Sequence, residues 1–501
     1  KVGVSEVRKN YNLLNPYEYA LALNDIRGSG TISDSDVEAY RQGLKGINWI
    51  DLMTRTAVTQ NYNIGIAGGA KRVRYFISGN LLDQNAVTIN SKYMRYGIRA
   101  NIDADVRRWL SVSAKINGSI LHQKNGAPNW FHVLNFSPTM ELRDPVTGIY
   151  NNDPYNIGTG NNPYGAMTEC YSDSYSYNLN ANMRLLFKIA KGLTFSVQGG
   201  YDYDHSPYYS FASSKVAPGA TSSMSNSSAM HRYWQNTNNL AYSGTFKGHS
   251  FSANAVWEMS GVVDTSLLIS GTGLNNENVG YWDIGNATVR SESNSYTESS
   301  LMSGIVRLNY DYKKRYFITA AFRADGSSKF QKGNRWGLFP SAAIAWDIAK
   351  ENFMKNQTVV EHLKLRASYG VTGNEGISAY STLGMLSATS YGWGTSVGYT
   401  GYWGNTFATP DLTWEKTTTY NAGIDLAFFN NRFTANVDYY YRKTTDLINT
   451  VYVSAGSNFA ATVTSNIGSL HNQGVEVAMT WRPVQTDDWY WELGYNFTYN
   501  Q

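Results

Sequence analysis

The sequence predicts an all-β protein, a transmembrane antiparallel β-barrel with long extracellular loops and short periplasmic turns. Three observations predict it: apolar and polar side chains alternate along many segments, short and long connections alternate between those segments, and aromatic residues make up 14% of the chain. Because a bilayer holds no water to satisfy backbone amides, a β-structure crosses it only as a closed barrel whose apolar side chains face lipid.

Composition narrows the class of protein. Charged residues make up 16% of the 501-residue chain, against about 25% in an ordinary soluble domain. No stretch approaches the roughly 18 consecutive apolar residues of a membrane-spanning helix, and mean hydropathy is −0.39. The net charge of +4 is too small to indicate nucleic-acid binding, and the single cysteine, Cys170, excludes a disulfide framework.

Alternation with a period of two residues defines the predicted strands. Met94, Tyr96 and Ile98 fall on one face, while Arg95 and Arg99 fall on the other. The same pattern recurs along the chain and continues to the last residues, from Trp489 onward. We count about sixteen such strands, many of them longer than the five or six residues usual in soluble sheets.

The connections between these strands alternate in length. The short ones are Gly68 to Lys71, Asp105 to Arg108, Ala190 to Gly192, Lys247 to Gly248, Lys313 to Arg315, Asn430 to Asn431 and Pro483 to Asp488. The long ones are expected at Gln123 to Ser174, Ser206 to Arg232, Gly261 to Glu298, Gly373 to Thr413 and Leu447 to Ala461. Short turns at one rim and long loops at the other are typical of outer-membrane barrels. A soluble β-sandwich, propeller or β-helix also alternates, and stays open as an alternative.

Enzyme signatures are missing from the sequence. No nucleophile elbow, phosphate-binding loop, dinucleotide fingerprint or zinc-protease helix occurs. The histidines are scattered, with His122 and His132 the closest pair, so solvated rings are a better interpretation than a metal site. We therefore expect no enzyme: no catalytic residue, no cofactor and no metal.

Aromatic residues in the predicted long loops are candidate ligand contacts, because flat rings stack on sugars. The alternative, equally weighted for any single residue, is that these rings pack the loops against one another. The candidates are Trp130, Tyr208, Tyr209, Tyr281, Trp282, Trp393, Tyr402 and Trp403.

Basic residues at the polar positions of the strands are expected to face the lumen. They could steer an anionic substrate, but such residues more often pair with acidic neighbours such as Asp103, Asp202 and Asp325. The candidates are Arg95, Arg99, Lys115, Arg184, Arg323 and Arg366.

Several sequence runs resemble one family in family order, the SusC/RagA-type TonB-dependent outer-membrane transporters. The run Thr59 to Ile64, with Gly68-Gly69 and Arg74 to Gly79, resembles the family's first hairpins. Further resemblance lies in Arg323 to Phe330, Arg335 to Gly337, Phe339 to Ser341, Leu363 to Gly370, Thr372 to Asn374, Leu412 to Lys416 and Asn472 to Glu476.

The resemblance implies a barrel of about 22 strands filled by a plug, in the outer membrane of a Gram-negative bacterium. It implies a SusD-like surface lipoprotein as a lid, energy from TonB acting on the plug, and import of oligosaccharides or peptides. Residues 1–56 are then expected to hold the end of the first barrel strand and the first extracellular loop, and residues 57–501 the barrel strands and their loops. The plug and the last strands are expected to lie outside this segment. A passive porin and a soluble carbohydrate-binding or carbohydrate-degrading β protein remain the alternatives.

Overall fold

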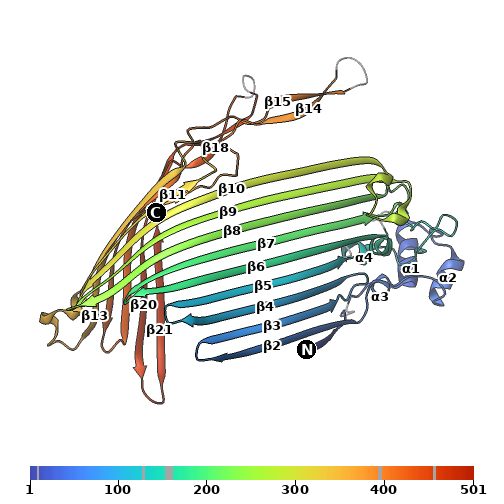
Figure 1. Ribbon diagram of the computed structural model, residues 1–501. Coiled ribbons are helices and arrows are strands. Elements are labelled where there is room, and N and C mark those ends of the chain that lie inside the picture. Colours follow the sequence, from blue (N-terminus) through green and yellow to red (C-terminus); the bar gives the residue numbers. More distant parts are fainter. Residues whose placement is uncertain (8–10, 127–129, 153–161, 393–397, 455–458) are drawn as a thin grey trace.

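A computed structural model describes residues 1–7, 11–126, 130–152, 162–392, 398–454 and 459–501. One large antiparallel sheet dominates it, and each strand of that sheet pairs with the next in chain order (Figure 1). The meander continues through the second half of the chain in the same way. The all-β prediction is confirmed.

The sheet holds 17 strands. They are β1 Val2–Ser5, β2 Ala57–Ala70, β3 Val73–Asn85, β4 Lys92–Arg107, β5 Leu110–Asn125, β6 Cys170–Ala190, β7 Leu193–Ala212, β8 Ser223–Phe246, β9 His249–Leu274, β10 Ala287–Tyr312, β11 Tyr316–Ser327, β12 Trp336–Asp347, β13 Val360–Asn374, β16 Glu415–Phe428, β17 Phe433–Thr445, β20 Ser469–Gln485 and β21 Tyr490–Asn500.

The remaining elements lie in the connections. Two short hairpins pair β14 Leu386–Gly392 with β15 Gly398–Gly404 and β18 Ile448–Tyr452 with β19 Thr462–Asn466. The helices are α1 Pro16–Arg27, α2 Asp34–Arg41, α3 Trp49–Met53, α4 Trp130–Asn135 and α5 Pro163–Thr168. In the described part of the chain, no helix is both long and apolar enough to cross a membrane.

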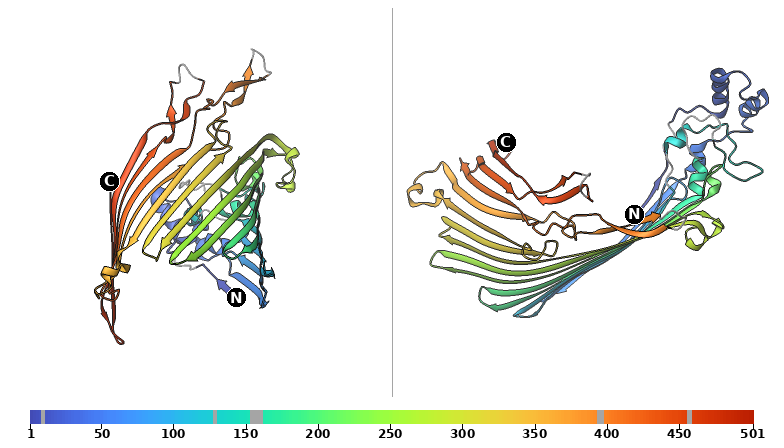
Figure 2. Two further views of the ribbon diagram at one scale, coloured as in Figure 1. Left: turned by 60° about the vertical axis from the view of Figure 1, so that its left-hand side comes forward. Right: turned by 90° about the horizontal axis from the view of Figure 1, so that it is seen from above.

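The sheet curls into a trough, with β1 and β21 at its two edges (Figure 2). The helices gather at the rim where the long connections lie, and the short turns lie at the opposite rim (Figure 1). The alternation of short and long connections is therefore the arrangement that the sequence predicted.

Two of the predicted long loops are wrong. Most of the segment Ser206 to Arg232 belongs to strands β7 and β8, and Gly261 to Glu298 is largely the upper part of β9 and β10. The register between β9 and β10 runs unbroken from Tyr312 opposite His249 to Val289 opposite Thr272. The upper part of β10 is rich in Ser, Thr and Asn on both faces, and in the upper part of β9 the runs Val262-Val263 and Leu267 to Ile269 put apolar side chains on both faces. Neither segment therefore shows the apolar alternation that identifies a half-buried strand in sequence.

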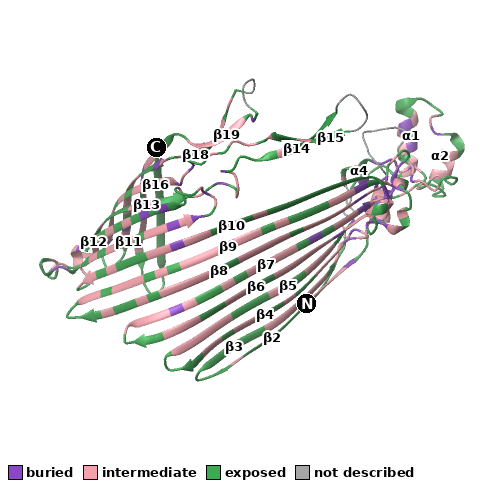
Figure 3. Ribbon diagram, turned by 45° about the horizontal axis from the view of Figure 1, so that its top comes forward, coloured by how far each residue is buried: buried purple, intermediate pink, exposed green. Residues whose placement is uncertain are grey.

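Buried side chains concentrate in the loops rather than in the sheet (Figure 3). One cluster joins Trp49 and Met53 of α3 to Phe136 and Met167, so the β1–β2 and β5–β6 connections pack on each other. The Trp49 indole N–H donates to the Ser137 carbonyl across this contact at 3.0 Å. A second cluster packs Phe330 and Trp414 between the β11–β12 and β13–β16 connections.

The sheet has an apolar face and a polar face. The cross-strand register shows which residues of neighbouring strands share each face. Ile98 lies between Gly79 and Gly118 of its neighbouring strands, and 60% of its surface is exposed. Arg99, the next residue, lies between Ser78 and Asn117. We call the face that carries Ile98 the apolar face and the face that carries Arg99 the polar face.

The apolar face has a limited height. On β6 its side chains run from Tyr177 to Phe187, and on β10 from Met302 to Tyr310. Each run is about the 9–11 residues that a tilted strand needs to cross a bilayer. The side chains between the two ends of each run are mostly apolar, as a lipid-facing band requires.

Strand length divides the sheet into two regions. The tall wall comprises β6 to β10, whose strands have 20 to 26 residues. The low rim comprises β11, β12, β13, β16 and β17, with 12 to 15 residues each. Because β11 pairs only with Leu301–Tyr312 of β10, the wall drops by a step at this strand.

Candidate functional site

Four predicted lumen cations lie together on the polar face of β4, β5 and β6. Arg99 is opposite Asn117, Lys115 is opposite Asn101 and Asn182, and all the cations of the group are exposed. None of them forms an ion pair with a residue that the structure describes. This group, the unpaired cations, consists of Arg95, Arg99, Lys115 and Arg184.

The two predicted cations of the low rim, Arg366 and Arg323, are paired with carboxylates instead. The Arg366 guanidinium on β13 donates to both oxygens of Asp425, at 2.8 and 2.9 Å, and to both oxygens of Asp438, at 3.0 and 3.1 Å. Gly423 makes room for it, because a Cβ atom there would lie 2.8 Å from the Arg366 Nη2. Such bidentate pairing fixes the side chain in one orientation.

Arg323 on β11 is paired in a similar way. Its Nε–H donates to Asp325 at 2.6 Å, and its Nη2 donates to the Ser303 hydroxyl of β10 at 3.0 Å. Asp325 is 6% exposed. The two alternatives for lumen cations therefore apply to different regions: Arg323 and Arg366 pair with acids, whereas the cations of β4 to β6 are left without acidic partners among the described residues.

Three of the candidate aromatic residues pack together on the apolar side of the tall wall, above its membrane band. The β9–β10 connection folds over β6 to β8, so Tyr281 stacks on Tyr209 at a centroid distance of 5.4 Å, and Trp282 lies 5.6 Å from Tyr209. Tyr209 is opposite Asp173, on the face that carries Leu179 lower down. These rings therefore cover the outer wall and do not line the lumen, although Trp282 remains 73% exposed.

Asp173 anchors this cluster, although no sequence motif selects it. It is 8% exposed, accepts a hydrogen bond from the Tyr281 hydroxyl at 2.9 Å, and lies 2.7 Å from His122 Nε2. Burial and this hydrogen bond to Asp173 raise the pKa of Tyr281 above its usual value. The alternation of Tyr171, Asp173 and Tyr175 was visible in sequence, but Tyr171 and Asp173 lay inside the segment Gln123 to Ser174, which was expected to be a loop.

Glu277 fastens the same connection to the top of β7. Its carboxylate accepts hydrogen bonds from the Ser213 hydroxyl and from the Ser214 N–H, the latter at 3.1 Å. Partial burial acts to raise the pKa of Glu277, but these hydrogen bonds outweigh it and hold the pKa below the usual carboxyl value.

The other candidate aromatics differ in position. Tyr208 lies on the polar face of β7 and is 39% exposed. Tyr402 and Trp403, both exposed, project from β15 in the β13–β16 connection. Trp130 begins α4 and packs against the buried cluster around Trp49. Trp393 lies outside the described residues.

The polar chemistry of this surface suits binding. Within the described ranges, no group of three or more His, Cys, Asp or Glu side chains is placed to hold a metal ion. What the polar face offers is amide, hydroxyl and guanidinium donors, which hydrogen-bond sugars, peptides and anions.

A family model described as "TonB dependent receptor-like, beta-barrel" matches residues 116–501. The chain therefore belongs to the TonB-dependent receptor family, whose members are β-barrel proteins of the outer membrane of Gram-negative bacteria. Within that family it is of the SusC/RagA type, as the sequence resemblance predicted.

The chain is 30% identical to TonB-dependent receptor P3 of Formosa agariphila, over 99% of this chain and 50% of that protein. It is 29% identical to TonB-dependent receptor SusC of Bacteroides thetaiotaomicron, over 100% of this chain and 51% of that protein. A structure of the RagAB peptide transporter superimposes with a TM-score of 0.73 and 23% identity, over 100% of this chain and 60% of that one, and it shows the same fold. The chain thus spans about half the length of the curated relatives it matches.

Proposed function

We propose that this chain forms the larger part of the barrel of a nutrient importer in the outer membrane. The observation that carries the proposal is the combination of a lipid-facing apolar band with a polar face bearing the unpaired cations. Like charges on one surface repel one another until a ligand or another chain neutralises them, and a wet lumen with cations attracts anionic solutes.

The proposed cargo is an oligosaccharide, or alternatively a peptide, that carries acidic groups. The exposed rings Tyr208, Tyr402 and Trp403 offer stacking surfaces for sugar faces. The proposed partners are a SusD-like surface lipoprotein, as in the family, and TonB acting through a plug that belongs to the complete protein.

A comparison of uptake between cells that lack the complete gene and the same cells complemented with it tests this proposal. Complemented cells should accumulate a labelled acidic oligosaccharide, and depletion of TonB should abolish uptake. Uptake that persists without TonB would identify a passive porin instead. Recovery of the protein in the soluble fraction would favour a carbohydrate-binding β protein and contradict the proposal.

Substitution of the exposed rings tests the cargo assignment. Trp403→Ala should weaken oligosaccharide binding by roughly three- to tenfold, the worth of one stacked ring. Phe131→Ala is the matched control, because Phe131 is 60% exposed but lies in the β5–β6 connection next to the packed Trp130. Equal losses of oligosaccharide affinity in both variants would contradict stacking of sugars on Trp403. Binding of acidic peptides but not of oligosaccharides would contradict it as well.

A further inference from the structure

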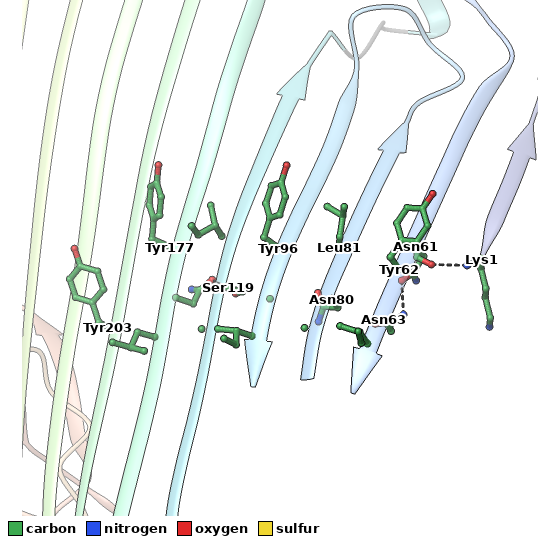
Figure 4. Close-up of a pocket in the computed structure, with 18 residues that line it drawn as sticks. Lys1, Asn61, Tyr62, Asn63, Asn80, Leu81, Tyr96, Ser119, Tyr177 and Tyr203 are labelled. Atoms are coloured by element: carbon green, nitrogen blue, oxygen red, sulfur yellow. Dashed lines mark hydrogen bonds between the residues drawn. The ribbon is translucent and has the colours of Figure 1, made fainter. Parts of the chain in front are cut away.

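The apolar face carries a hollow that the import function does not use. It has a volume of about 1070 Å³ and extends over β2 to β7 (Figure 4). The hollow lies within the membrane band, directly below a row of tyrosines. Its lining is mostly hydrocarbon, with Ile64, Leu81, Ile98, Ile120 and Leu179 among the contributing side chains.

Cross-strand register shows how the hollow is built. Its upper row runs Tyr62, Leu81, Tyr96, Ile120 and Tyr177 on five successive strands. The row beneath runs Ile64, Gly79, Ile98, Gly118 and Leu179. Large side chains and glycines therefore alternate in the lower row, which leaves two notches, one on each side of Ile98.

These two glycines are not required by backbone geometry. Neither Gly79 nor Gly118 has a positive φ. A Cβ atom at Gly79 would lie 3.8 Å from its nearest neighbour, the Ile64 Cγ2, and one at Gly118 would lie 3.5 Å from the Ile98 Cγ2. Both are ordinary van der Waals contacts. A side chain would fit at either position, and it would fill the notch.

The tyrosine row places the hollow in the outer leaflet. Tyr62, Tyr96 and Tyr177 line its upper margin on the side of the long loops, and Tyr203 lies opposite Leu179 at the level of the lower row (Figure 4). Tyrosines at such a level mark the membrane–water interface, with rings in hydrocarbon and hydroxyls toward lipid head groups. A molecule in the hollow therefore meets hydrocarbon below and hydroxyl donors above.

We propose that this hollow is a binding site for the acyl chains of an outer-leaflet lipid, with one chain over Gly79 and another over Gly118. The two notches are separated by two strand spacings, about 9.6 Å. Water gains little from contact with this apolar surface. A flexible acyl chain, in contrast, can fill an irregular apolar hollow and gains dispersion contacts along its length. The tyrosine hydroxyls hold the ester or phosphate groups of the same molecule.

Native mass spectrometry of the complete protein in mild detergent tests the site, with lipid A, the acylated and phosphorylated lipid of the outer leaflet, as the added lipid. The wild-type protein should retain bound lipid, and the Gly79→Ile/Gly118→Ile double variant should bind it about tenfold more weakly. Gly199→Ile is the matched control. Gly199 lies on the same face of β7 and outside the hollow, and a Cβ atom added there would have no other atom within 4 Å.

The same spectra report the oligomeric state, and resistance of the fold to heat checks the variants. Loss of lipid in the double variant with an unchanged oligomeric state supports the proposal. Equal lipid binding by the double variant and the wild type overturns it. A dimer that dissociates in the double variant, with lipid binding unchanged, overturns it in favour of a contact between two copies of the chain.

Discussion

The tall wall and the low rim cross the same membrane with strands of very different length. β10 has 26 residues and β12 has 12, yet the apolar face of each supplies a band of similar height. On β10 this band runs from Met302 to Tyr310, and above it both faces are polar and exposed. The bilayer therefore sets the length of the apolar run on these strands, whereas the length of the strand above it is not limited by the membrane.

The polar faces of the two regions of the barrel differ as well. In the low rim, Arg366 is held between Asp425 and Asp438. On β4 to β6, at the other side of the sheet, the cations lie on the polar face without acidic partners among the described residues. The cations of one region are therefore paired with carboxylates, and those of the other region are not.

The largest expected effect is on the stability of the barrel, and it distinguishes the part of β10 inside the membrane from the part above it. Val306→Arg on β10 should destabilise the folded barrel by about 2–4 kcal/mol, because it places a guanidinium in hydrocarbon. Asn294→Arg lies on the same strand and the same face but above the band, so its effect should be within about 0.5 kcal/mol. Urea unfolding of the complete protein in lipid vesicles measures both. Similar losses would mean that the membrane extends higher than the apolar band.

Neighbouring residues on β4 give a second form of the same test. Ile98→Arg should be destabilising, but by less than the roughly 2–4 kcal/mol expected near the midplane, because Ile98 lies just below the interfacial tyrosine row. Arg99→Ala should be tolerated, because Arg99 lies on the polar face and is exposed. Equal tolerance at both positions in the same unfolding assay would reverse the assignment of faces.

A smaller effect separates the paired cations from the unpaired ones. Arg366→Met should destabilise the barrel by about 1–3 kcal/mol, because Asp425 and Asp438 are left facing each other. The control Arg184→Met removes an exposed cation that has no acidic partner among the described residues, so stability should change by less than about 0.5 kcal/mol. Differential scanning calorimetry compares the two. A large loss for Arg184→Met would show that this cation is structurally engaged.

The smallest effect concerns the connection that caps the tall wall. Because the folded-state pKa of Glu277 lies below its unfolded value of about 4.3, its hydrogen bonds stabilise the connection above that pH. The stabilisation is lost as pH falls through the folded pKa. Pepsin should therefore cleave between residues 275 and 286 faster at pH 3 than at pH 4.5. Glu277→Gln should remove much of this difference, and an unchanged pH dependence in that variant would exclude Glu277 as its source.

The sequence predicted the membrane part of this fold because the bilayer leaves a signature. Lipid on one face and water on the other force alternation, as around Ile98 and Arg99, and the short turns follow at fixed points. The upper part of β10 carries no such signature, because both of its faces are exposed and residues such as Ser293 and Asn294 are compatible with strand or loop. In the upper part of β9, apolar residues such as Leu267 and Leu268 fall on both faces, so the alternation is missing there too.

The face of the basic candidates was predictable from the alternation, whereas the aromatic candidates were predictable by residue type but not by face. Tyr208 and Tyr209 are adjacent in sequence, and only a continuous strand assigns Tyr208 to the polar face and Tyr209 to the packed outer cluster. Likewise, the pairing of Arg366 depends on two acids that lie 59 and 72 residues further along the chain. Such partners follow from strand register, which local sequence patterns do not specify.

Labelling of intact cells tests the central claim most directly. In a Cys170→Ser background of the complete protein, single cysteines replace Asn294 in the extension of β10, Val306 in the apolar band and Lys191 in a short turn. An impermeant thiol reagent should label position 294 in intact cells and position 191 only after the outer membrane is opened, and position 306 should stay unreactive in both. Labelling of position 191 in intact cells, with protection of position 294, would contradict the orientation of the barrel and the extracellular tall wall.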